Sequence, residues 1–138
     1  MNTYEHIRER AFQANRQLPG LGLVLFTFGN VSAVDRDLGV FAIKPSGVPY
    51  QDLSADKMVI VDFDAKIVDG RLRPSSDTKT HAVLYKHWEK IGGISHTHST
   101  YATAWAARGE PVPCILTMMA DEFGGEIPVG PFAVIGDD

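Results

Sequence analysis

The stretch 92–100 is Gly92-Gly93-Ile94-Ser95-His96-Thr97-His98-Ser99-Thr100, and it predicts a short buried strand that follows a pair of glycines. Side chains alternate across a strand with a period of two, so His96 and His98 face one side and Thr97 faces the other. Two imidazoles about one pleat apart on a rigid face can bind a single metal ion. Because an arbitrary His-x-His is more often an ordinary polar strand end, the metal hypothesis depends on the rest of the chain.

The composition predicts one folded domain covering residues 1–138. Hydrophobic residues make up 44% of the chain and charged residues 22%, and a chain of this size buries roughly two thirds of its unfolded surface. The formal net charge of −4 and the scattered Lys and Arg residues argue against a nucleic-acid partner. No stretch approaches the roughly 18 apolar residues of a membrane span, and the single cysteine, Cys114, excludes an internal disulfide framework. These features predict a cytoplasmic protein with no membrane partner.

The hydrophobic periodicity predicts an α/β domain in which helices cover a mostly antiparallel sheet. A capping box at Asn2 and Glu5 begins the first helix, and Pro19-Gly20 ends its pattern. The predicted elements in chain order are a helix at 3–18, strands at 21–28, 31–34 and 40–44, one helical turn at 54–58, a hairpin of 58–63 with 66–68, a helix from 74–78 to 90, the histidine strand and a helix at 100–107. The candidate buried positions of the second long helix are Val83, Leu84, His87 and Trp88.

A metal site at His96 and His98 needs a further ligand, because a catalytic zinc takes about three protein ligands. Asp77 is the nearest candidate carboxylate, since the start of a helix can face the strand to which that helix leads. Asp77 can instead cap the helix by accepting backbone N–H bonds, and the two roles can be shared. His81 lies one helical turn beyond Asp77 and can support the site, whereas the remaining histidines suit surface or packing positions.

Three short polar loops predict an anion site, because each offers backbone N–H groups, hydroxyls or an amide that suit the oxygens of a phosphate. The candidate ligands are Gly29, Asn30, Lys44, Ser46, Gly47, Ser75 and Ser76. Ser75 and Ser76 precede a helix, whose dipole stabilises an anion by about 0.3–1 kcal/mol. Each loop alone is typical of an ordinary turn, and none matches the P-loop or the dinucleotide-binding motif. Together, in an acidic protein, they indicate a locally held anionic ligand.

An acidic pair follows an apolar stretch at Ala120-Asp121-Glu122. A carboxylate in such a place can act as a general acid or base, which contributes about 10²–10⁴-fold to a reaction rate. It can equally belong to a solvated turn that leads to Gly124-Gly125. The spacing of the residues leaves both alternatives open.

Four segments, in this order and at this spacing, resemble the class II aldolase/epimerase (adducin-head) family. They are Thr27-Phe28-Gly29-Asn30-Val31-Ser32-Ala33-Val34-Asp35, Ile43-Lys44-Pro45-Ser46-Gly47-Val48, Pro74-Ser75-Ser76-Asp77-Thr78 and Gly92-Gly93-Ile94-Ser95-His96-Thr97-His98-Ser99. The resemblance covers nearly the whole chain and implies α/β/α layers around a mostly antiparallel central sheet. It also implies one zinc ion per subunit, with another divalent metal as the alternative, at His96 and His98 with Asp77 at the metal site. The loop residues named above would contact a substrate phosphate, with Lys44 close by.

Within that family the segments are most similar to those of the sugar-phosphate 4-epimerases. The resemblance implies a zinc-dependent epimerase that interconverts L-ribulose 5-phosphate and D-xylulose 5-phosphate, a pair of phosphorylated pentuloses, by retro-aldol and aldol chemistry. Asp121 falls on the position of a proton donor or acceptor that acts across a subunit interface of a homotetramer. A class II phosphosugar aldolase is the close alternative, although those enzymes have a glutamate in place of Asp77. A non-catalytic adducin-head-like binding module is the other alternative.

The chain departs from the family pattern at two places. Met119 stands where the epimerases have a histidine. The sequence ends at Asp138, before the portion that carries the family's third metal-binding histidine and its catalytic tyrosine. We therefore expect a domain that is truncated at its C-terminus and incomplete as an enzyme.

Overall fold

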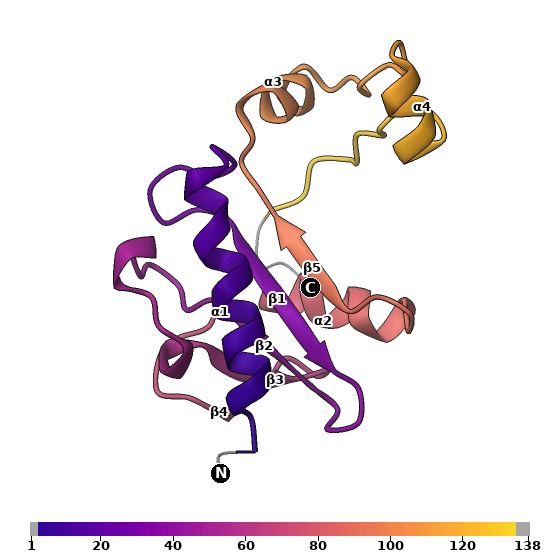
Figure 1. The fold of residues 1–138 in the computed structure, drawn as a ribbon. Coiled ribbons are helices and arrows are strands. Elements are labelled where there is room, and N and C mark those ends of the chain that lie inside the picture. The colour runs from indigo at the N-terminus through magenta and orange to yellow at the C-terminus, as the bar shows by residue number, and fades with distance from the viewer. Residues whose placement is uncertain (1–2, 135–138) are drawn as a thin grey trace.

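The computed structural model describes residues 3–134, which form a five-stranded antiparallel sheet with helices packed on it (Figure 1). The elements are α1 (Glu5–Gly20), β1 (Asn30–Asp35), β2 (Val40–Ile43), the 3₁₀ turns η1 (Tyr50–Asp52) and η2 (Ala55–Lys57), β3 (Val59–Asp62), β4 (Ile67–Asp69), α2 (Thr78–His87), β5 (Gly93–His96), α3 (Thr100–Arg108) and α4 (Thr117–Phe123). The strand order is β4-β3-β2-β1-β5, so β5 joins the sheet beside the first strand. Among these residues, no helix has the length and apolar character needed to cross a membrane.

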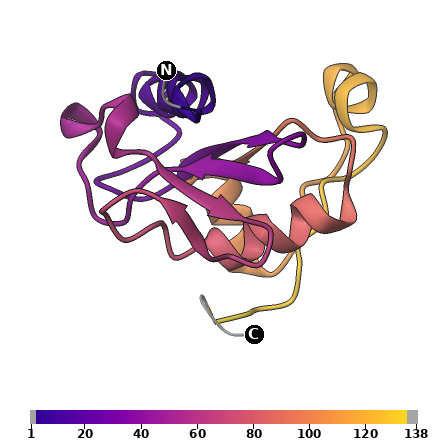
Figure 2. The same cartoon turned by 90° about the horizontal axis from the view of Figure 1, so that it is seen from below.

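The sheet lies between α1 and α2, and each of its faces carries a separate hydrophobic core (Figure 2). Alternation along β2 sends Val40 and Ala42 towards α1, and Phe41 and Ile43 towards α2. The core on the α1 side contains Ile7, Ala11, Ala33, Val40, Ala42, Met58 and Ile60. The core on the α2 side contains Val34, Phe41, Ile43, Val59, Val61, Ala82 and Tyr85. The predicted α/β/α layers around an antiparallel sheet are therefore confirmed.

The register of the sheet brings the polar loops together at one of its ends. Asn30, the first residue of β1, pairs with His96, the last residue of β5. Because β2 runs antiparallel to β1, Lys44 leaves β2 at the same end. Ser75 then joins this end through its backbone N–H, which donates to the carbonyl oxygen of Lys44 at 3.0 Å. Segments that are far apart in the sequence thus surround one place.

Two predicted strands differ from the structure. Residues 21–28 are rich in β-forming side chains but fold as a loop over the end of the sheet, with left-handed backbone at Gly22 (φ 68°) and Phe26 (φ 53°). Strand propensity expresses how well a side chain packs on a half-buried pleated surface, and Phe26, at 84% exposure, has no such surface. The histidine strand β5 forms but ends at His96, so His98 lies beyond the strand that was predicted to carry both histidines. The strand is also half exposed rather than buried, because it pairs only with β1.

The helices begin and end close to their predicted bounds, but the buried face of α2 is different. Its buried residues are Thr78, His81, Ala82 and Tyr85. Of the predicted buried positions, Val83 and Trp88 are 53% and 58% exposed, His87 is also exposed, and Leu84 is only partly buried. The helix instead turns inward the face that begins at Thr78, and it ends at His87, before Trp88. The predicted capping residue Asn2 lies outside the described residues, and the N-cap position of α1 is Tyr4, without a side-chain capping bond.

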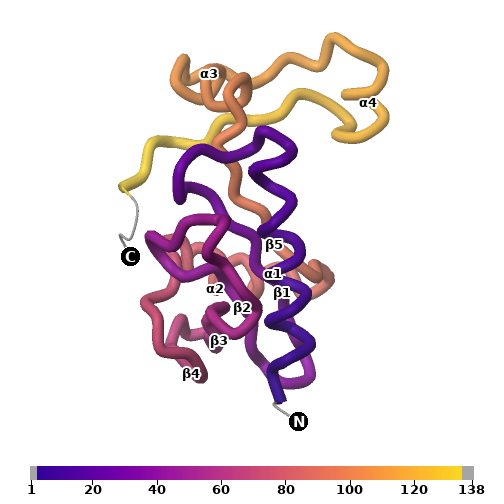
Figure 3. The backbone as a smooth tube through the Cα atoms, turned by 60° about the vertical axis from the view of Figure 1, so that its left-hand side comes forward, coloured from indigo at the N-terminus to yellow at the C-terminus, as the bar shows by residue number. Residues whose placement is uncertain are grey.

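Residues 100–134 form an arm that extends from the end of β5 away from the sheet (Figures 1 and 3). The arm contains α3 and α4, and neither helix has a buried residue. Gly109 and Gly124, both in the left-handed conformation, end the two helices as C-caps. The predicted helix at 100–107 is confirmed, and the acidic pair at Asp121 belongs to α4 rather than to a turn.

Candidate functional site

A cavity of about 360 Å³ lies where the polar loops meet. Its lining residues are Thr27, Phe28, Gly29, Asn30, Lys44, Pro45, Ser46, Gly47, Ser75, Ser76, Asp77, His96 and His98. Every predicted site residue except Asp121 is therefore in one cavity. Two larger hollows, of about 790 Å³ beside α1 and about 570 Å³ beside α2, have no histidine in their linings. The histidines and the polar loops distinguish the smaller cavity as the candidate functional site.

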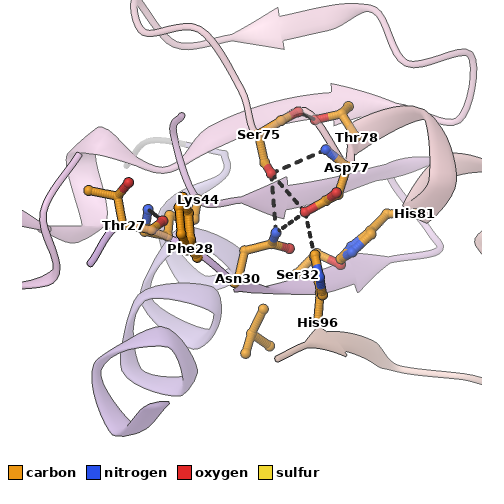
Figure 4. A network of polar contacts seen from close by, with 12 residues as sticks. Thr27, Phe28, Asn30, Ser32, Lys44, Ser75, Asp77, Thr78, His81 and His96 are labelled. Atoms are coloured by element: carbon orange, nitrogen blue, oxygen red, sulfur yellow. Dashed lines mark hydrogen bonds and ion pairs between the residues drawn. The ribbon is translucent and has the colours of Figure 1, made fainter. Parts of the chain in front are cut away.

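Asp77 is the centre of a hydrogen-bond network at the floor of this cavity (Figure 4). Its Oδ2 atom accepts hydrogen bonds from Asn30 Nδ2 at 2.6 Å, from His96 Nδ1 at 2.7 Å and from Ser75 Oγ at 3.3 Å. Burial alone would raise the pKa of Asp77, but the hydrogen bonds and charge supplied by His96 and Asn30 hold this pKa below its usual value. Asp77 therefore remains a carboxylate, which can only accept hydrogen bonds.

His96 is oriented by this carboxylate. Because a carboxylate accepts and does not donate, the bonded Nδ1 must carry the proton, and the lone pair of the neutral ring lies on Nε2. The hydrogen bond that His96 donates to Asp77 raises the pKa of His96, against the opposing effect of burial. Metal-binding histidines commonly donate their other ring N–H to a carboxylate in this way. The arrangement thus suits His96 to bind a metal ion through Nε2.

His98 follows the end of β5 and lies beside His96, with the two ring centroids 4.9 Å apart. Its backbone N–H donates to the carbonyl oxygen of Leu23 at 2.8 Å, and its ring stacks on Phe28 with centroids 5.3 Å apart. The structure describes no group of three or more His, Cys, Asp or Glu side chains placed to hold a metal ion. The side chains available to bind a metal ion are thus the two adjacent imidazoles of His96 and His98, while the Asp77 carboxylate contacts the ring of His96. Direct ligation by Asp77 stays a prediction.

Residues with free backbone donors also line the cavity. Within residues 3–134, the N–H groups of Gly29, Gly47 and Ser76 have no hydrogen-bond acceptor. Their neighbours differ, because the N–H of Ser46 donates to Arg73 O at 2.9 Å and the N–H of Ser75 is bonded to Lys44. Unpaired N–H groups from three loops that line one cavity are the donors that bind the oxygens of an anion. The predicted phosphate loops therefore have the required chemistry, although their ligand stays a prediction.

Lys44 is buried beside these donors, at 2% exposure. Its Nζ atom donates to Thr27 O at 3.0 Å and lies 4.9 Å from the centroid of the Tyr50 ring. Burial lowers the pKa of Lys44, since the charged form loses hydration. A carbonyl oxygen and an aromatic face offset only part of that loss. An anionic ligand bound in the cavity would therefore stabilise the charged ammonium group of Lys44.

Gly29 is packed closely between Val24 and the backbone of His96, and Gly29→Ala is expected to lower the free energy of unfolding by about 2–4 kcal/mol. Its backbone is left-handed (φ 74°), and an added Cβ would lie 2.5 Å from Val24 Cγ1 and 2.9 Å from His96 O. Urea denaturation measures the loss. Gly39→Ala is the matched control, because Gly39 has φ 67° and no atom within 4 Å of its Cβ position. Equal losses in the two variants would contradict the proposed close packing.

A second buried network lies next to the site on the α2 side. Ser32 Oγ is 2.7 Å from both His81 Nδ1 and Tyr85 Oη. Burial lowers the pKa of His81 to about 4, so this imidazole is neutral at physiological pH. Asp77, His81 and Tyr85 follow one another at a spacing of four residues, which was the available sequence signal for this face of α2. Sequence reasoning detected the proximity of His81 to Asp77 but missed Ser32, Tyr85 and Tyr50.

Asp121 does not join the cavity of its own chain. It is exposed on α4, within the arm, and it is absent from the cavity lining. Met119 lies in the same short helix. A catalytic role for Asp121 would therefore require a cavity other than the one formed by residues 27–98.

Together, these observations define an α/β/α sandwich with two adjacent histidines and free N–H donors in a cavity at one end of its sheet. Residues 9–138 match the family model of the Class II Aldolase and Adducin N-terminal domain, and the chain belongs to this family. The sequence is 53% identical over 124 residues to the L-ribulose-5-phosphate 4-epimerase UlaF of Salmonella paratyphi B, covering 90% of this chain and 54% of that protein. The chain thus spans about half the length of the curated relatives it matches.

Solved structures have the same fold. An L-fuculose 1-phosphate aldolase superposes with a TM-score of 0.88 at 30% sequence identity, over 96% of this chain and 62% of the aldolase. YgbL of Klebsiella pneumoniae superposes with a TM-score of 0.81 at 27% identity, over 99% of this chain and 67% of that protein. The architecture of a sheet between helices is therefore shared across these proteins.

Proposed function

We propose that the protein is a zinc-dependent epimerase that interconverts L-ribulose 5-phosphate and D-xylulose 5-phosphate. The observation that carries this proposal is the single cavity that combines the His96–Asp77 pair, His98 and the free N–H groups of three loops. The 53% identity to UlaF, an L-ribulose-5-phosphate 4-epimerase, supports the choice of sugar. We further propose that the protein acts in the cytoplasm, in keeping with its single cysteine.

His96 and His98 would hold the zinc ion, and Asp77 would keep His96 in the required tautomer. Bound there, zinc supplies Lewis-acid stabilisation of the negative charge that develops on the ketose oxygens. A further ligand is needed beyond the two imidazoles, because catalytic zinc sites use about three protein ligands. The predicted ligation by Asp77 would require its carboxylate to contact zinc as well as His96. The short aspartate, bonded by Asn30 as well, is better suited to orienting His96 than to acting as a mobile base.

The phosphate of the substrate would be held by the N–H groups of Gly29, Gly47 and Ser76, with the hydroxyl of Ser46 and the charge of Lys44 nearby. Asn30 and Ser75 would shape this subsite, since Asn30 Nδ2 is 3.1 Å from Ser75 Oγ. The reaction breaks the C3–C4 bond, so the C4 hydroxyl loses its proton and becomes the aldehyde of glycolaldehyde phosphate. This fragment must turn and be attacked on its other face without leaving. A firm phosphate anchor meets that requirement.

Asp121 would accept the proton from the C4 oxygen and return it after the C3–C4 bond has re-formed. Because Asp121 is exposed on the arm and lies outside its own cavity, we propose that it acts in the site of a neighbouring subunit. A homotetramer with sites at its interfaces would provide this arrangement. The extended arm, whose helices have no buried residue, would gain its packing from the same assembly.

Incubation of the zinc-loaded protein with ¹³C-labelled L-ribulose 5-phosphate tests the function by NMR. We expect D-xylulose 5-phosphate to accumulate without free glycolaldehyde phosphate. Release of glycolaldehyde phosphate and dihydroxyacetone would instead support the class II aldolase alternative, towards which the likeness to an L-fuculose 1-phosphate aldolase points. Phosphate binding without any turnover would support the adducin-head-like binding module.

A further inference from the structure

Tyr50 lies behind the wall of the cavity rather than in it. It begins the short turn η1 and is half-buried, and its single hydroxyl proton is shared between two successive carbonyl oxygens, Phe28 O and Gly29 O, each 2.9 Å from the phenol oxygen. Phe28 and Gly29, whose carbonyl oxygens accept this hydrogen bond, both line the cavity. Burial raises the pKa of Tyr50 to about 12, so the phenol keeps its proton and remains a donor at physiological pH.

Lys44 binds the backbone carbonyl of Thr27, the residue that precedes Phe28. Its Nζ atom donates to Thr27 O at 3.0 Å while lying 4.9 Å from the Tyr50 ring centroid. The carbonyl oxygens of three consecutive residues, 27–29, are thus bound by one stacked lysine–tyrosine pair. Tyr50 and Lys44 come from outside the turn, at separations of 22 residues from Phe28 and 17 residues from Thr27. The pair therefore holds the turn through tertiary contacts.

The planarity of the peptide bond carries this restraint to the other side of the turn. In a trans peptide the N–H of one residue points opposite to the carbonyl of the preceding residue, and no described peptide bond is cis. Fixing Phe28 O on Tyr50 therefore directs the Gly29 N–H away from Tyr50. That N–H has no acceptor within residues 3–134, and Gly29 lines the cavity. The free donor therefore lies on the side of the turn away from Tyr50, in a residue that lines the cavity.

A glycine at this position makes an external restraint useful. Gly29 adopts φ 74°, a conformation that glycine enters and leaves readily because it has no Cβ. The peptide between Phe28 and Gly29 could rotate and turn its N–H away from the cavity. Two carbonyl contacts with one phenol favour a single orientation before the ligand arrives, and such preorganisation increases affinity by reducing the entropy lost on binding.

We propose that Tyr50 is a positioning residue, whose hydroxyl holds the Phe28 and Gly29 carbonyls so that the Gly29 N–H is presented to the phosphate of the substrate. The proposal rests on the proposed function, in that it takes the anion to be a sugar phosphate. It assigns to Tyr50 an effect on phosphate affinity and none on the chemical step.

Tyr50→Phe removes the hydroxyl and keeps the ring over Lys44. We expect the Kd for inorganic phosphate, measured by calorimetry, to rise about five- to tenfold, the loss that follows from one neutral hydrogen bond. The KM for L-ribulose 5-phosphate should rise in parallel, while kcat and zinc content stay within about twofold of the wild-type values, because uniform binding alone is lost. A purely structural role would lower thermal stability without this separation of KM from kcat.

Tyr85→Phe is the matched control. It also removes a buried phenol hydroxyl, which lies 2.7 Å from Ser32 Oγ on the α2 side of the sheet. We expect it to lower the melting temperature while leaving the Kd for inorganic phosphate unchanged. Amide hydrogen exchange of the peptide covering residues 26–30 gives a second measurement, and faster exchange is expected in Tyr50→Phe than in Tyr85→Phe.

Unchanged phosphate affinity in Tyr50→Phe would overturn the proposal, as would a wild-type protein that does not bind inorganic phosphate. Unchanged exchange of residues 26–30, together with weakened affinity, would also overturn it, since the hydroxyl would then act on the anion by another route. Failure of the proposed function is distinguishable. A wild-type protein without epimerase turnover, in which Tyr50→Phe still weakens phosphate binding, would remove the epimerase reaction and support the positioning role.

Discussion

The double replacement of His96 and His98 by alanine is expected to abolish the proposed zinc binding and to lower the proposed epimerase turnover by more than about 10³-fold. The two imidazoles are adjacent, and Asp77 directs the Nε2 lone pair of His96 away from itself. A bound metal contributes several kcal/mol of transition-state stabilisation, and every 1.4 kcal/mol corresponds to about tenfold in rate. Zinc content by mass spectrometry is the first measurement, because it reports the site independently of turnover.

His87→Ala is the control for this experiment. His87 is exposed near the end of α2, where its Nδ1 atom lies 2.8 Å from Val83 O, and it is not among the residues that line the cavity. We expect zinc content and turnover to remain at wild-type levels. Retention of zinc by the His96→Ala/His98→Ala double variant would move the metal site elsewhere, and would also remove the reason for the contact between Asp77 and His96.

Asp121→Asn is expected to keep zinc content and phosphate affinity but to lower kcat by about 10²–10⁴-fold, the usual contribution of a general acid or base. The amide retains the size of the side chain and cannot take the proton from the C4 oxygen. Glu122→Gln is the matched control, because it removes the same charge from the adjacent exposed position of α4. Unchanged turnover in Asp121→Asn would exclude Asp121 from the mechanism.

Mixing the two inactive variants tests whether Asp121 acts across an interface. In mixed oligomers of Asp121→Asn with the His96→Ala/His98→Ala variant, some sites would combine an intact histidine pair with an intact Asp121 from a neighbour. We expect turnover to return in the mixture above the level of either variant alone. Turnover that stays at the level of the separate variants would place Asp121 in the site of its own chain, against its position on the arm.

Local patterns predicted the architecture well. The alternation in β2 and the helical spacing of α1 each repeat within a few residues, so the sequence contains enough information to identify them. The same patterns failed where packing decides. Residues 21–28 contain β-forming side chains, but they form a loop in which Gly22 has a left-handed backbone. In α2, packing against the sheet determines which face is buried, and this is the face that begins at Thr78.

The role of Asp77 shows the same limit within the site. The sequence left open whether Asp77 caps α2 or serves a metal site, because both roles suit a residue at a helix start. In the structure Asp77 occupies the N-cap position but makes no side-chain capping bond, and its carboxylate instead binds Asn30 and His96. The separations are 47 and 19 residues, so no local pattern could distinguish the alternatives.

The sequence alone determines the residue types that the site can use: two histidines separated by one residue, glycines and serines in three loops, and a lysine beside one of these loops. Only the tertiary structure decided that the loops share one cavity, that Asp77 orients His96, that Tyr50 holds the turn at 27–29, and that Asp121 lies elsewhere. The physical reason is the range of the interactions. Backbone propensity and periodicity act between near neighbours, whereas these hydrogen bonds join residues brought together by the register of the sheet and the burial of both its faces.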